Sequence, residues 1–433
     1  MLPEIETRSA SEIKAFQEGL LQEQVAYNVR NSPYYQRLFR DEGLDPADIR
    51  TLEDLRRIPP TTKDDLQEHE ADFICVPRKR IVDHITTSGT QGDPVTFALT
   101  DNDLDRLAYN EAISFACSGC DEEDLLQLMT TMDRRFMAGL AYFLGARRLG
   151  AGIVRVGSGV PALQWDTIQR MGPTVLITVP SFLLKMVEYA EANGIDHRKS
   201  SVQRAICIGE PLRDAELSFN SLAQRIKEVW DIELCSTYAS TEMATAFNEC
   251  PFGKGGHHHP ELIITEFLDE EGEPVPADEP GELTVTTLGV EGMPLMRYRT
   301  GDVCYRYQEP CECGRRTLRV GPVIGRKQQM IKYKGTTFYP PALYDILNEF
   351  PEVRNYMVEV FTDNTGTDQL QVHVGTENGG EALEKSIRDH FRAKLRVAPT
   401  VNFCAVDELE KARFPETKRK PVKFIDHRKE AKN

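Results

Sequence analysis

The 433-residue sequence has no hydrophobic run near the roughly 18 apolar residues that a membrane-spanning helix needs. Its first residues, Met1 to Arg8, are acidic early and lack an apolar core, so they do not predict a signal peptide. Its ten cysteines are too few for a disulfide scaffold and suit a reducing compartment. We therefore expect a cytoplasmic protein without a membrane partner.

Basic residues are in deficit, because 52 Lys and Arg stand against 68 Asp and Glu, a net charge of −16. Nucleic-acid binding needs clustered Lys and Arg, so no nucleic-acid partner is expected. A composition of 40% hydrophobic and 28% charged residues is typical of a globular protein, and the length suggests about two or three domains. Base rates favour a homodimer.

Apolar strand-like runs alternate with helical ones between residues 125 and 230, the pattern of βαβ units around a mainly parallel sheet. Helical, polar segments precede them, at 9–29, 53–57 and 63–68. The alternating strands are expected at 125–129, 152–156, 174–179 and 204–208, and the helices at 137–149, 163–171, 181–193 and 215–230.

Short antiparallel strands joined by Gly-rich turns are expected from residue 262 to 307. After a hinge near Lys327 to Gln329, helices at 341–349 and 380–394 and strands at 356–361 and 370–375 predict an α+β module. The predicted class is α/β, with mixed and parallel sheets and helices in a large N-terminal domain. We expect that domain at 1–327, with a small β-subdomain at about 245–325, and a small mobile α+β domain at 328–433.

The segment ITTSGTQGDPV, residues 85–95, is rich in hydroxyl groups and glycine and precedes a predicted strand. Glycines let a backbone approach phosphate closely, and hydroxyls with backbone N–H groups form a concave anion site. An ordinary Ser/Thr/Gly hairpin turn has the same composition, so the segment alone leaves both interpretations open.

The segment STYASTEM, residues 236–243, carries Tyr238 and Glu242 in a loop of small residues. Tyr238 could stack on a base, and Glu242 could ligate Mg²⁺ beside phosphates, since Mg²⁺ prefers one or two carboxylates plus phosphate oxygens. A loop with a capping glutamate is the alternative.

Two further segments could contact a ribose or a phosphate. In YRTGDV, residues 298–303, Asp302 follows a tight glycine turn, where a carboxylate can accept both ribose hydroxyls or satisfy its own backbone. In the pair Gly325 and Arg326, the guanidinium could reach phosphate or ribose, or lie on a basic strand edge.

Together and in this order, these four segments resemble the adenylate-forming superfamily of acyl-CoA synthetases, adenylation domains and luciferases. Residues 88–94 are similar to its phosphate loop, 238–242 to its Y-G-x-T-E, 299–302 to its R-T-G-D and 325–326 to its hinge strand. Within the superfamily, the whole chain most resembles the phenylacetate–CoA ligase family. That likeness is carried by SPYY (32–35), TTKDDL (61–66), IGEPL (208–212), MPLMRYRTGD (293–302) and FPETKRKPVKFIDHR (414–428).

The resemblance implies a role for each matching residue. Thr241 would contact the α-phosphate, Glu242 would hold Mg²⁺, and Lys420 would be the catalytic lysine, with Lys418 as the alternative. The implied nucleotide-binding residues are Ser88, Gly89, Thr90, Gly92, Gly209, Glu210, Pro211, Tyr238, Ala239, Ser240, Thr241, Asp302 and Arg326. The chain departs from the family pattern with Gln91 and Asp93 in the phosphate loop, where threonine and lysine are usual.

The implied activity is that of an aryl-acid–CoA ligase, which uses ATP, Mg²⁺ and coenzyme A and forms an acyl-adenylate first. The C-terminal domain would rotate between the two half-reactions. An apolar acid pocket is expected around Tyr142, Phe143, Ala239 and Phe247. Two alternatives remain: an adenylate-forming enzyme with another acceptor, such as a nucleotidyl transferase, and a catalytically silent nucleotide-binding protein.

A Cys₃His set is a candidate structural zinc site. Cys250 is followed by a histidine run at 257–259 and, further along, by Cys311 and Cys313 on a glycine turn. Buried free thiols and an exposed histidine run are the alternative. Some members of the ligase family carry a similar set, and that resemblance favours His257 over His258 and His259. The other seven cysteines are expected to be ordinary buried thiols.

Overall fold

The computed structural model describes residues 2–87, 94–333, 336–362, 368–415 and 421–428. The chain divides into two compact units, and the division falls within one strand, between Pro322 and Val323. The large unit comprises Met1–Thr87, Asp93–Phe219 and Ala223–Pro322, and the small unit comprises mainly Val323–Asn433. The predicted domain boundary after residue 327 lies a few residues later and stays a prediction.

The large unit begins with helices that are fixed by side-chain caps. The Ser9 hydroxyl accepts the N–H of Glu12, and the Glu12 carboxylate accepts the N–H of Ser9, so a capping box starts α1. The helices of this segment are α1 (Ala10–Asn31), α2 (Pro33–Asp41) and α3 (Lys63–Glu68), with 3₁₀ turns at Glu4–Thr7, Pro46–Asp48, Glu53–Arg57, Glu70–Phe73 and Arg78–Arg80.

Eleven strands form the main sheet of the large unit, in the order β10-β11-β12-β13-β9-β8-β7-β6-β5-β3-β4. The five strands from β7 to β4 are parallel, as the alternating pattern predicted, and β5 is buried along its whole length, as expected of a strand covered by helices on both faces. The parallel strands are β3 (Leu125–Leu128), β4 (Gly152–Arg155), β5 (Val175–Thr178), β6 (Arg204–Ile208) and β7 (Glu233–Ser240).

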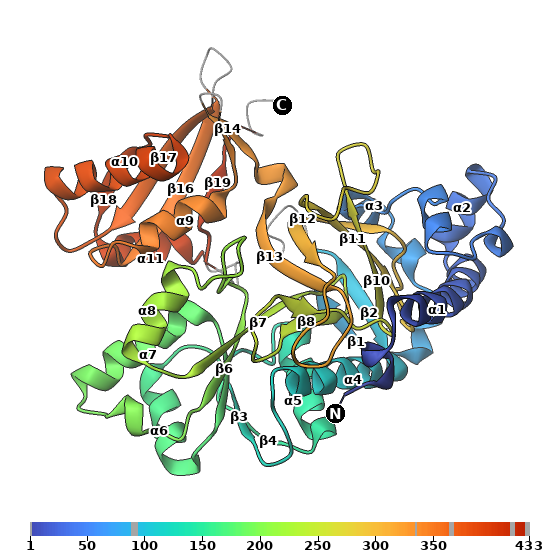
Figure 1. Ribbon diagram of the computed structural model, residues 1–433, viewed down its shortest axis with the longest axis horizontal. Coiled ribbons are helices and arrows are strands. Elements are labelled where there is room, and N and C mark those ends of the chain that lie inside the picture. Colours follow the sequence, from blue (N-terminus) through green and yellow to red (C-terminus); the bar gives the residue numbers. More distant parts are fainter. Residues whose placement is uncertain (1, 88–93, 334–335, 363–367, 416–420, 429–433) are drawn as a thin grey trace. The chain divides into compact units, whose positions relative to one another are not determined.

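Antiparallel strands extend the same sheet, because β8 pairs with β7 and continues the ladder. The residues expected to form a β-subdomain are therefore continuous with the parallel strands in Figure 1. These strands are β8 (Thr245–Glu249), β9 (Gly256–His257), β10 (Ile263–Leu268), β11 (Gly281–Thr287), β12 (Tyr298–Tyr307) and β13 (Arg319–Arg326).

Helices and a separate hairpin complete the large unit. The hairpin joins β1 (Ile81–Thr86) to β2 (Thr96–Thr100), and α4 (Asp101–Cys117) follows it. The helices between the parallel strands are α5 (Met137–Leu149), α6 (Pro161–Met171), α7 (Pro180–Ala192) and α8 (Ser221–Val229).

The helix predicted at 215–230 begins later than expected, at Ser221. The Asp214 carboxylate accepts the backbone N–H groups of Glu216 and Ser218 at 3.1 and 2.9 Å, and Leu217 adopts a φ of +64°. A short polar side chain that satisfies nearby backbone groups competes with helix formation, so this segment is a turn.

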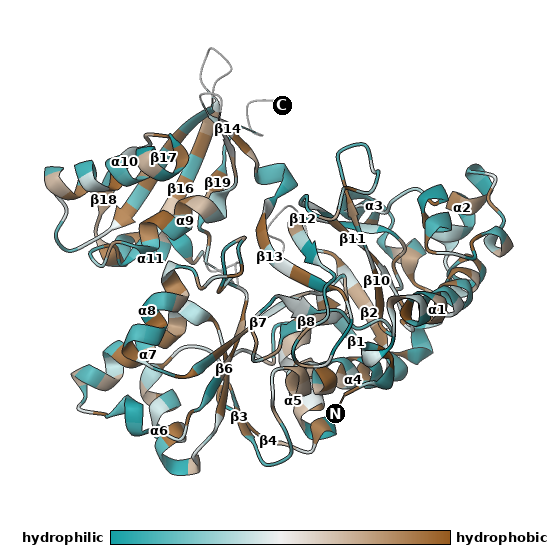
Figure 2. Cartoon of the chain, viewed as in Figure 1, coloured by the Kyte–Doolittle hydropathy of each residue, from teal (hydrophilic) through white to brown (hydrophobic). Residues whose placement is uncertain are grey.

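The small unit is an α+β module, as predicted. Its four-stranded sheet has the order β18-β17-β16-β19, and hydrophobic residues recur along β16 and β17 (Figure 2). Val358, Val372, Ile387 and Phe391 are fully buried in its core. Its elements are β14 (Ile331–Tyr333), β15 (Thr336–Phe338), α9 (Pro340–Asn348), β16 (Asn355–Thr362), β17 (Asp368–Gly375), α10 (Glu381–Leu395), β18 (Thr400–Cys404), α11 (Val406–Arg413) and β19 (Phe424–Asp426).

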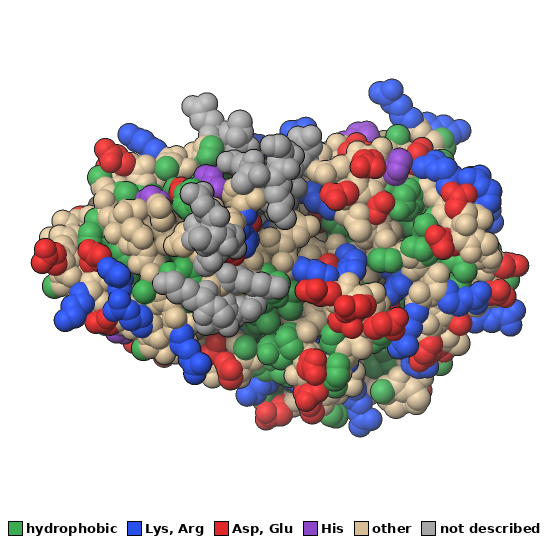
Figure 3. Space-filling view, turned by 90° about the horizontal axis from the view of Figure 1, so that it is seen from above, with side chains coloured by type: hydrophobic (Ala, Val, Ile, Leu, Met, Phe, Trp, Pro, Cys, Tyr) green, Lys and Arg blue, Asp and Glu red, His purple; other side chains and the backbone are tan. Residues whose placement is uncertain are grey.

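Membrane-spanning helices and the distribution of surface charge were both considered from the sequence. Among the described residues, no helix has the length and hydrophobicity needed to cross a membrane. Acidic and basic side chains are interspersed over the face seen in Figure 3, so on that face the excess negative charge is not gathered in one region.

Candidate nucleotide site and metal centre

The predicted adenine segments meet at one edge of the main sheet. β6 and β7 are parallel neighbours, with Ile208 opposite Thr237, so the residues that follow them lie at the same, carboxyl-terminal edge. Five parallel strands in the order β4-β3-β5-β6-β7 form a doubly wound arrangement, in which ligands bind outside the carboxyl ends of the strands.

The segment after β6 is fixed by the start of α7. Gly209 has a φ of +77°, a backbone conformation that glycine adopts readily. Beyond it, the Glu210 carboxylate accepts the backbone N–H of Ser181 at 3.0 Å. A carboxylate at a helix N-terminus is stabilised by the helix dipole, so this contact holds the predicted adenine segment, which includes Pro211, against the sheet.

Tyr238 and Asp302, 64 residues apart in sequence, form the most direct contact among the predicted nucleotide-binding residues. The Tyr238 hydroxyl donates to Asp302 Oδ2 at 2.8 Å. Burial, followed by the negative charge of Asp302, raises the pKa of Tyr238 well above its usual value, so the phenol remains a donor. The Tyr238 ring stacks on Phe247, with centroids 5.9 Å apart and planes 19° apart.

Asp302 is held by a tight turn within β12. Gly301 has a φ of +77°, and the Asp302 backbone N–H donates to Thr300 Oγ1 at 3.1 Å. The residue is 7% exposed. Its carboxylate is therefore nearly buried and is oriented by both Tyr238 and its own turn.

The segment after β7 forms a compact turn. The Ala244 N–H donates to the Thr241 carbonyl at 3.2 Å, the Met243 N–H donates to Ser240 Oγ at 3.3 Å, and Ala244 has a φ of +47°. Thr241 and Glu242 are half-buried in this turn. Glu242 thus offers a carboxylate at the edge of the sheet, a position suited to a divalent cation beside a phosphate.

The remaining predicted site residues lie in varied settings. Arg326 ends β13 in the small unit. Tyr142 packs in the core of the large unit, with its ring 6.0 Å from that of Phe115, and Ala239 is exposed. Phe143 is half-buried beneath the Arg155 guanidinium, 5.3 Å from its ring centroid. Outside the described residues lie Ser88, Gly89, Thr90, Gly92, Lys420 and the alternative Lys418.

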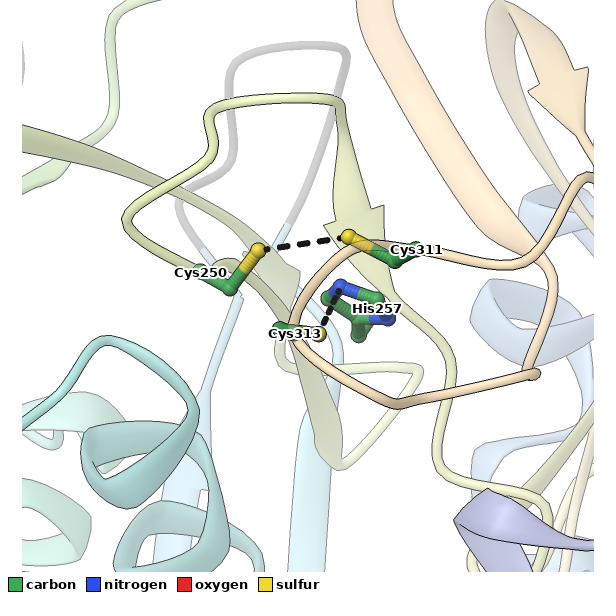
Figure 4. Close-up of side chains that lie close together, drawn as sticks. All are labelled: Cys250, His257, Cys311 and Cys313. Atoms are coloured by element: carbon green, nitrogen blue, oxygen red, sulfur yellow. Dashed lines mark hydrogen bonds between the residues drawn. The ribbon is translucent and has the colours of Figure 1, made fainter.

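The structure brings the predicted Cys₃His set together. Cys250 follows β8, His257 lies on β9, and Cys311 and Cys313 lie between β12 and β13; their ligand atoms all lie within 4.8 Å of one another (Figure 4). Cys250 Sγ is 3.6 Å from Cys311 Sγ, and Cys313 Sγ is 3.4 Å from His257 Nε2. Ligands around tetrahedral zinc are about 3.6 to 3.8 Å apart, so this donor set fits the ion.

Hydrogen-bond partners distinguish the three consecutive histidines. His257 Nδ1 lies 3.3 Å from Thr317 Oγ1, which leaves Nε2 facing Cys313. His258 is bonded to the Ile263 carbonyl, and His259 to Glu6, so neither belongs to the cysteine cluster. Burial lowers the pKa of His257 to about 3, which keeps the imidazole neutral, the form that binds a metal.

Two buried carboxylates that the sequence did not reveal surround the metal centre. Glu6 is fully buried, accepts Arg315 Nε at 2.7 Å and bonds to His259; burial opposes its charge, but the contacts with His259 and Arg315 lower its pKa. Glu249, next to Cys250, accepts Arg213 Nε at 2.6 Å and the Ser236 N–H at 3.2 Å. No sequence pattern joins residue 6 to residues 259 and 315, because the contact depends on the tertiary fold.

Comparisons with known proteins cover nearly the whole chain. A family model described as "AMP-binding enzyme" matches residues 42–292, and one described as "AMP-binding enzyme C-terminal domain" matches residues 335–428. A phenylacetate-coenzyme A ligase of Thermus thermophilus is 33% identical over 91% of this chain and 90% of that protein. The one of Escherichia coli is 30% identical over the same shares, and the one of Aromatoleum evansii is 29% identical over 96% of each.

The fold has a close structural counterpart. A crystal structure of 2-hydroxyisobutyryl-CoA ligase in the postadenylation state, in complex with R3-HIB-AMP, matches with a TM-score of 0.85 over 99% of this chain and 93% of that one. At 24% identity, this likeness speaks for the fold, and it confirms the predicted α/β class.

Proposed function

The chain belongs to the family of AMP-binding enzymes, and on that basis we propose that it is an ATP-dependent ligase that joins a carboxylic acid to coenzyme A. The observation that carries this proposal is the length of the likeness. A phenylacetate-coenzyme A ligase is 33% identical over 91% of the chain, a span that includes every element of the candidate nucleotide site. The finer assignment to an aryl acid is supported by the names of these three relatives, each a phenylacetate-coenzyme A ligase.

In the first half-reaction, a carboxylate oxygen of the acid attacks the α-phosphorus of ATP, and the bond to pyrophosphate breaks. Thr241, after β7, is positioned to donate a hydrogen bond to the α-phosphate. Asp302 accepts the ribose hydroxyls, and its bond to Tyr238 sets the distance between the base and the sugar. Held in this way, the reacting atoms meet without the loss of further translational entropy.

The attack brings two anions together, so a cation at the α-phosphate stabilises the transition state. Lys420 is our choice for that cation, with Lys418 as the alternative; both lie outside the described residues. In the second half-reaction, the thiolate of coenzyme A attacks the acyl carbonyl, and AMP leaves with the electrons of the broken acyl–oxygen bond. Rotation of the C-terminal domain between the steps stays a prediction.

Two metal ions have separate roles in this proposal. Mg²⁺ held by Glu242 supplies charge neutralisation to the phosphates when it is bound. Zinc held by Cys250, His257, Cys311 and Cys313 would have four protein ligands and no open coordination position, so its role would be structural. The fit of ligand atoms within 4.8 Å of one another supports the zinc assignment.

The experiment is pyrophosphate release by the purified protein with Mg-ATP, over a panel of aryl and aliphatic acids, with and without coenzyme A. We expect release that depends on an aryl acid and on coenzyme A, with an acyl-CoA product of the matching mass. Pyrophosphate release that does not depend on coenzyme A would indicate that the adenylate is transferred to another acceptor. Nucleotide binding without release from any acid would instead favour a silent binding protein. A homodimer and a cytoplasmic location are checked by light scattering and by cell fractionation.

A further inference from the structure

The turn between β3 and α5, residues 131–136, has no role in the reaction proposed above. Within it, Arg134 and Arg135 are consecutive and both have a φ of +58°. Residues other than glycine rarely adopt this left-handed conformation, and two in succession are rarer still. Such strain persists only where the surroundings enforce it, and it is concentrated at ligand-binding sites.

Local contacts hold the strained turn in shape. The Phe136 N–H donates to the Asp133 carbonyl at 3.2 Å, and the Thr131 hydroxyl bonds to the Asp133 carboxylate. Behind the turn, Gly139 is so close that an added Cβ would lie 2.0 Å from the Thr131 carbonyl oxygen. The conformation of the two arginines is therefore imposed by close packing and hydrogen bonds on both sides.

The turn lies at the edge of the sheet where doubly wound folds bind their ligands. It follows β3, the strand at which the order of the parallel strands reverses, and in doubly wound sheets ligands bind at that point. The Arg135 carbonyl accepts the Thr86 N–H at 3.0 Å, and Thr86 ends β1. Just beyond it, Thr87 and Val95 bond to each other at 3.0 Å, at the base of the predicted phosphate loop.

Arg135 is the arginine of this turn whose charge has no partner among the described residues. Arg135 is exposed, and its guanidinium makes no hydrogen bond or ion pair with the part of the chain that the structure describes. The predicted phosphate loop, residues 88–93, contains Asp93 and no lysine or arginine in its sequence. The planar guanidinium of an arginine suits phosphate and carboxylate equally.

We propose that the turn at residues 131–136 presents Arg135 to an anionic group of a bound substrate. That group is a phosphate of ATP or a second carboxylate on the acid. The inference rests on the proposed function and adds a binding residue to it. Because the substrate acid would then carry a second carboxylate, the panel of acids should include dicarboxylic acids.

The test compares Arg135→Met and Arg135→Lys with the matched control Arg170→Met, which removes an exposed arginine of α6 that pairs only with Asp166 at 2.7 Å. Binding of ATP and of adenosine is measured by calorimetry, and acid-dependent pyrophosphate release is measured with an aryl acid and its dicarboxylic analogue. If Arg135 binds phosphate, Arg135→Met weakens ATP binding about 10-fold and leaves adenosine binding unchanged. If it binds the acid, only the KM for the dicarboxylic acid rises, by a similar factor. In both cases we expect Arg135→Lys to retain part of the lost binding, because lysine keeps the positive charge.

Equal behaviour of Arg135→Met and Arg170→Met in every assay would overturn the inference. Circular dichroism and the thermal midpoint show whether each variant is folded, and Arg135→Lys keeps the test informative if Arg135→Met is not. The nucleotide-binding arm does not need turnover. A failure of the proposed ligase activity is therefore distinguishable from a failure of this inference.

Discussion

Cys250, His257, Cys311 and Cys313 come from three separate segments, and their ligand atoms lie within 4.8 Å of one another. Around them, Glu6, Arg315 and Thr317 are buried and hydrogen-bonded. The predicted nucleotide site is built differently, because its residues on β7 and in the turns after β6 and β7 are half-buried or exposed, although Asp302 on β12 is buried. A ligand that stays bound can be enclosed by buried, hydrogen-bonded groups. A ligand that enters and leaves needs a site that is open to solvent, such as the edge of a sheet.

The two regions are nevertheless joined by one buried ion pair. Glu249 precedes Cys250 in the chain, and its carboxylate accepts both Arg213 Nε and the N–H of Ser236 on β7. Arg213 itself follows the predicted adenine segment after β6. The metal centre can therefore affect the nucleotide site through the position of β7, and also through Phe247 on β8, whose ring stacks on Tyr238. Variants in the two regions should still have separable effects on stability and on rate.

The largest effect is expected at the nucleotide site, from Lys420→Ala. Loss of a cation that stabilises transition-state charge lowers the rate of adenylation by about 100- to 1000-fold. The thermal midpoint is measured alongside, to show that the variant is folded. The measurement is acid-dependent pyrophosphate release, with Lys385→Ala, an exposed lysine of α10, as the matched control. Full activity of Lys420→Ala, with Lys418→Ala inactive, would move the role to the alternative lysine.

The opposite pattern is expected at the metal centre, from Cys311→Ser. We expect about one zinc per chain in the parent protein, loss of that zinc in the variant, and a loss of about 3 kcal/mol in the free energy of unfolding. Metal analysis and urea unfolding measure these quantities, and Cys75→Ser, a cysteine outside the cluster, is the control. A variant that keeps its stability but loses adenylation would show that the centre is not structural.

Several elements could be predicted because their signals are local. The strands β3 and β6 and the helix α5 lie within a residue of their expected bounds, since apolar runs and caps define them in sequence. The grouping of Cys250 with Cys311 and Cys313 was also expected, because Cys311 and Cys313 form a close pair on a glycine turn and some members of the resembled family carry a similar set. The turn at 215–220 was predicted as helix, because the competing hydrogen bonds of Asp214 cannot be inferred from apolar periodicity.

Contacts that depend on tertiary structure could not be predicted. Nothing in the sequence pairs Glu6 with Arg315, or the Arg135 carbonyl with Thr86, because each contact joins segments through the packing of whole elements. The choice among His257, His258 and His259 rested on resemblance alone, and in the structure it follows from which carbonyl or carboxylate each ring reaches. The partners of each histidine ring depend on where the fold buries that ring, which the sequence does not reveal.

The smallest effect is expected from Tyr238→Phe, which keeps the ring and removes only the hydroxyl that donates to Asp302 at 2.8 Å. The Asp302 backbone N–H still donates to Thr300 Oγ1, so the turn is kept and the variant removes one hydrogen bond to the carboxylate. One hydrogen bond to a charged group is worth about 1.5 kcal/mol or somewhat more, so the KM for ATP should rise about 10-fold. The kcat should change little, because the hydroxyl contacts no reacting atom. If kcat falls as much as KM rises, Tyr238 acts in the transition state, and the strand end of β7 is then a catalytic element as well as a binding surface. That outcome would extend the contrast with the metal centre, whose residues we expect to affect stability and not rate.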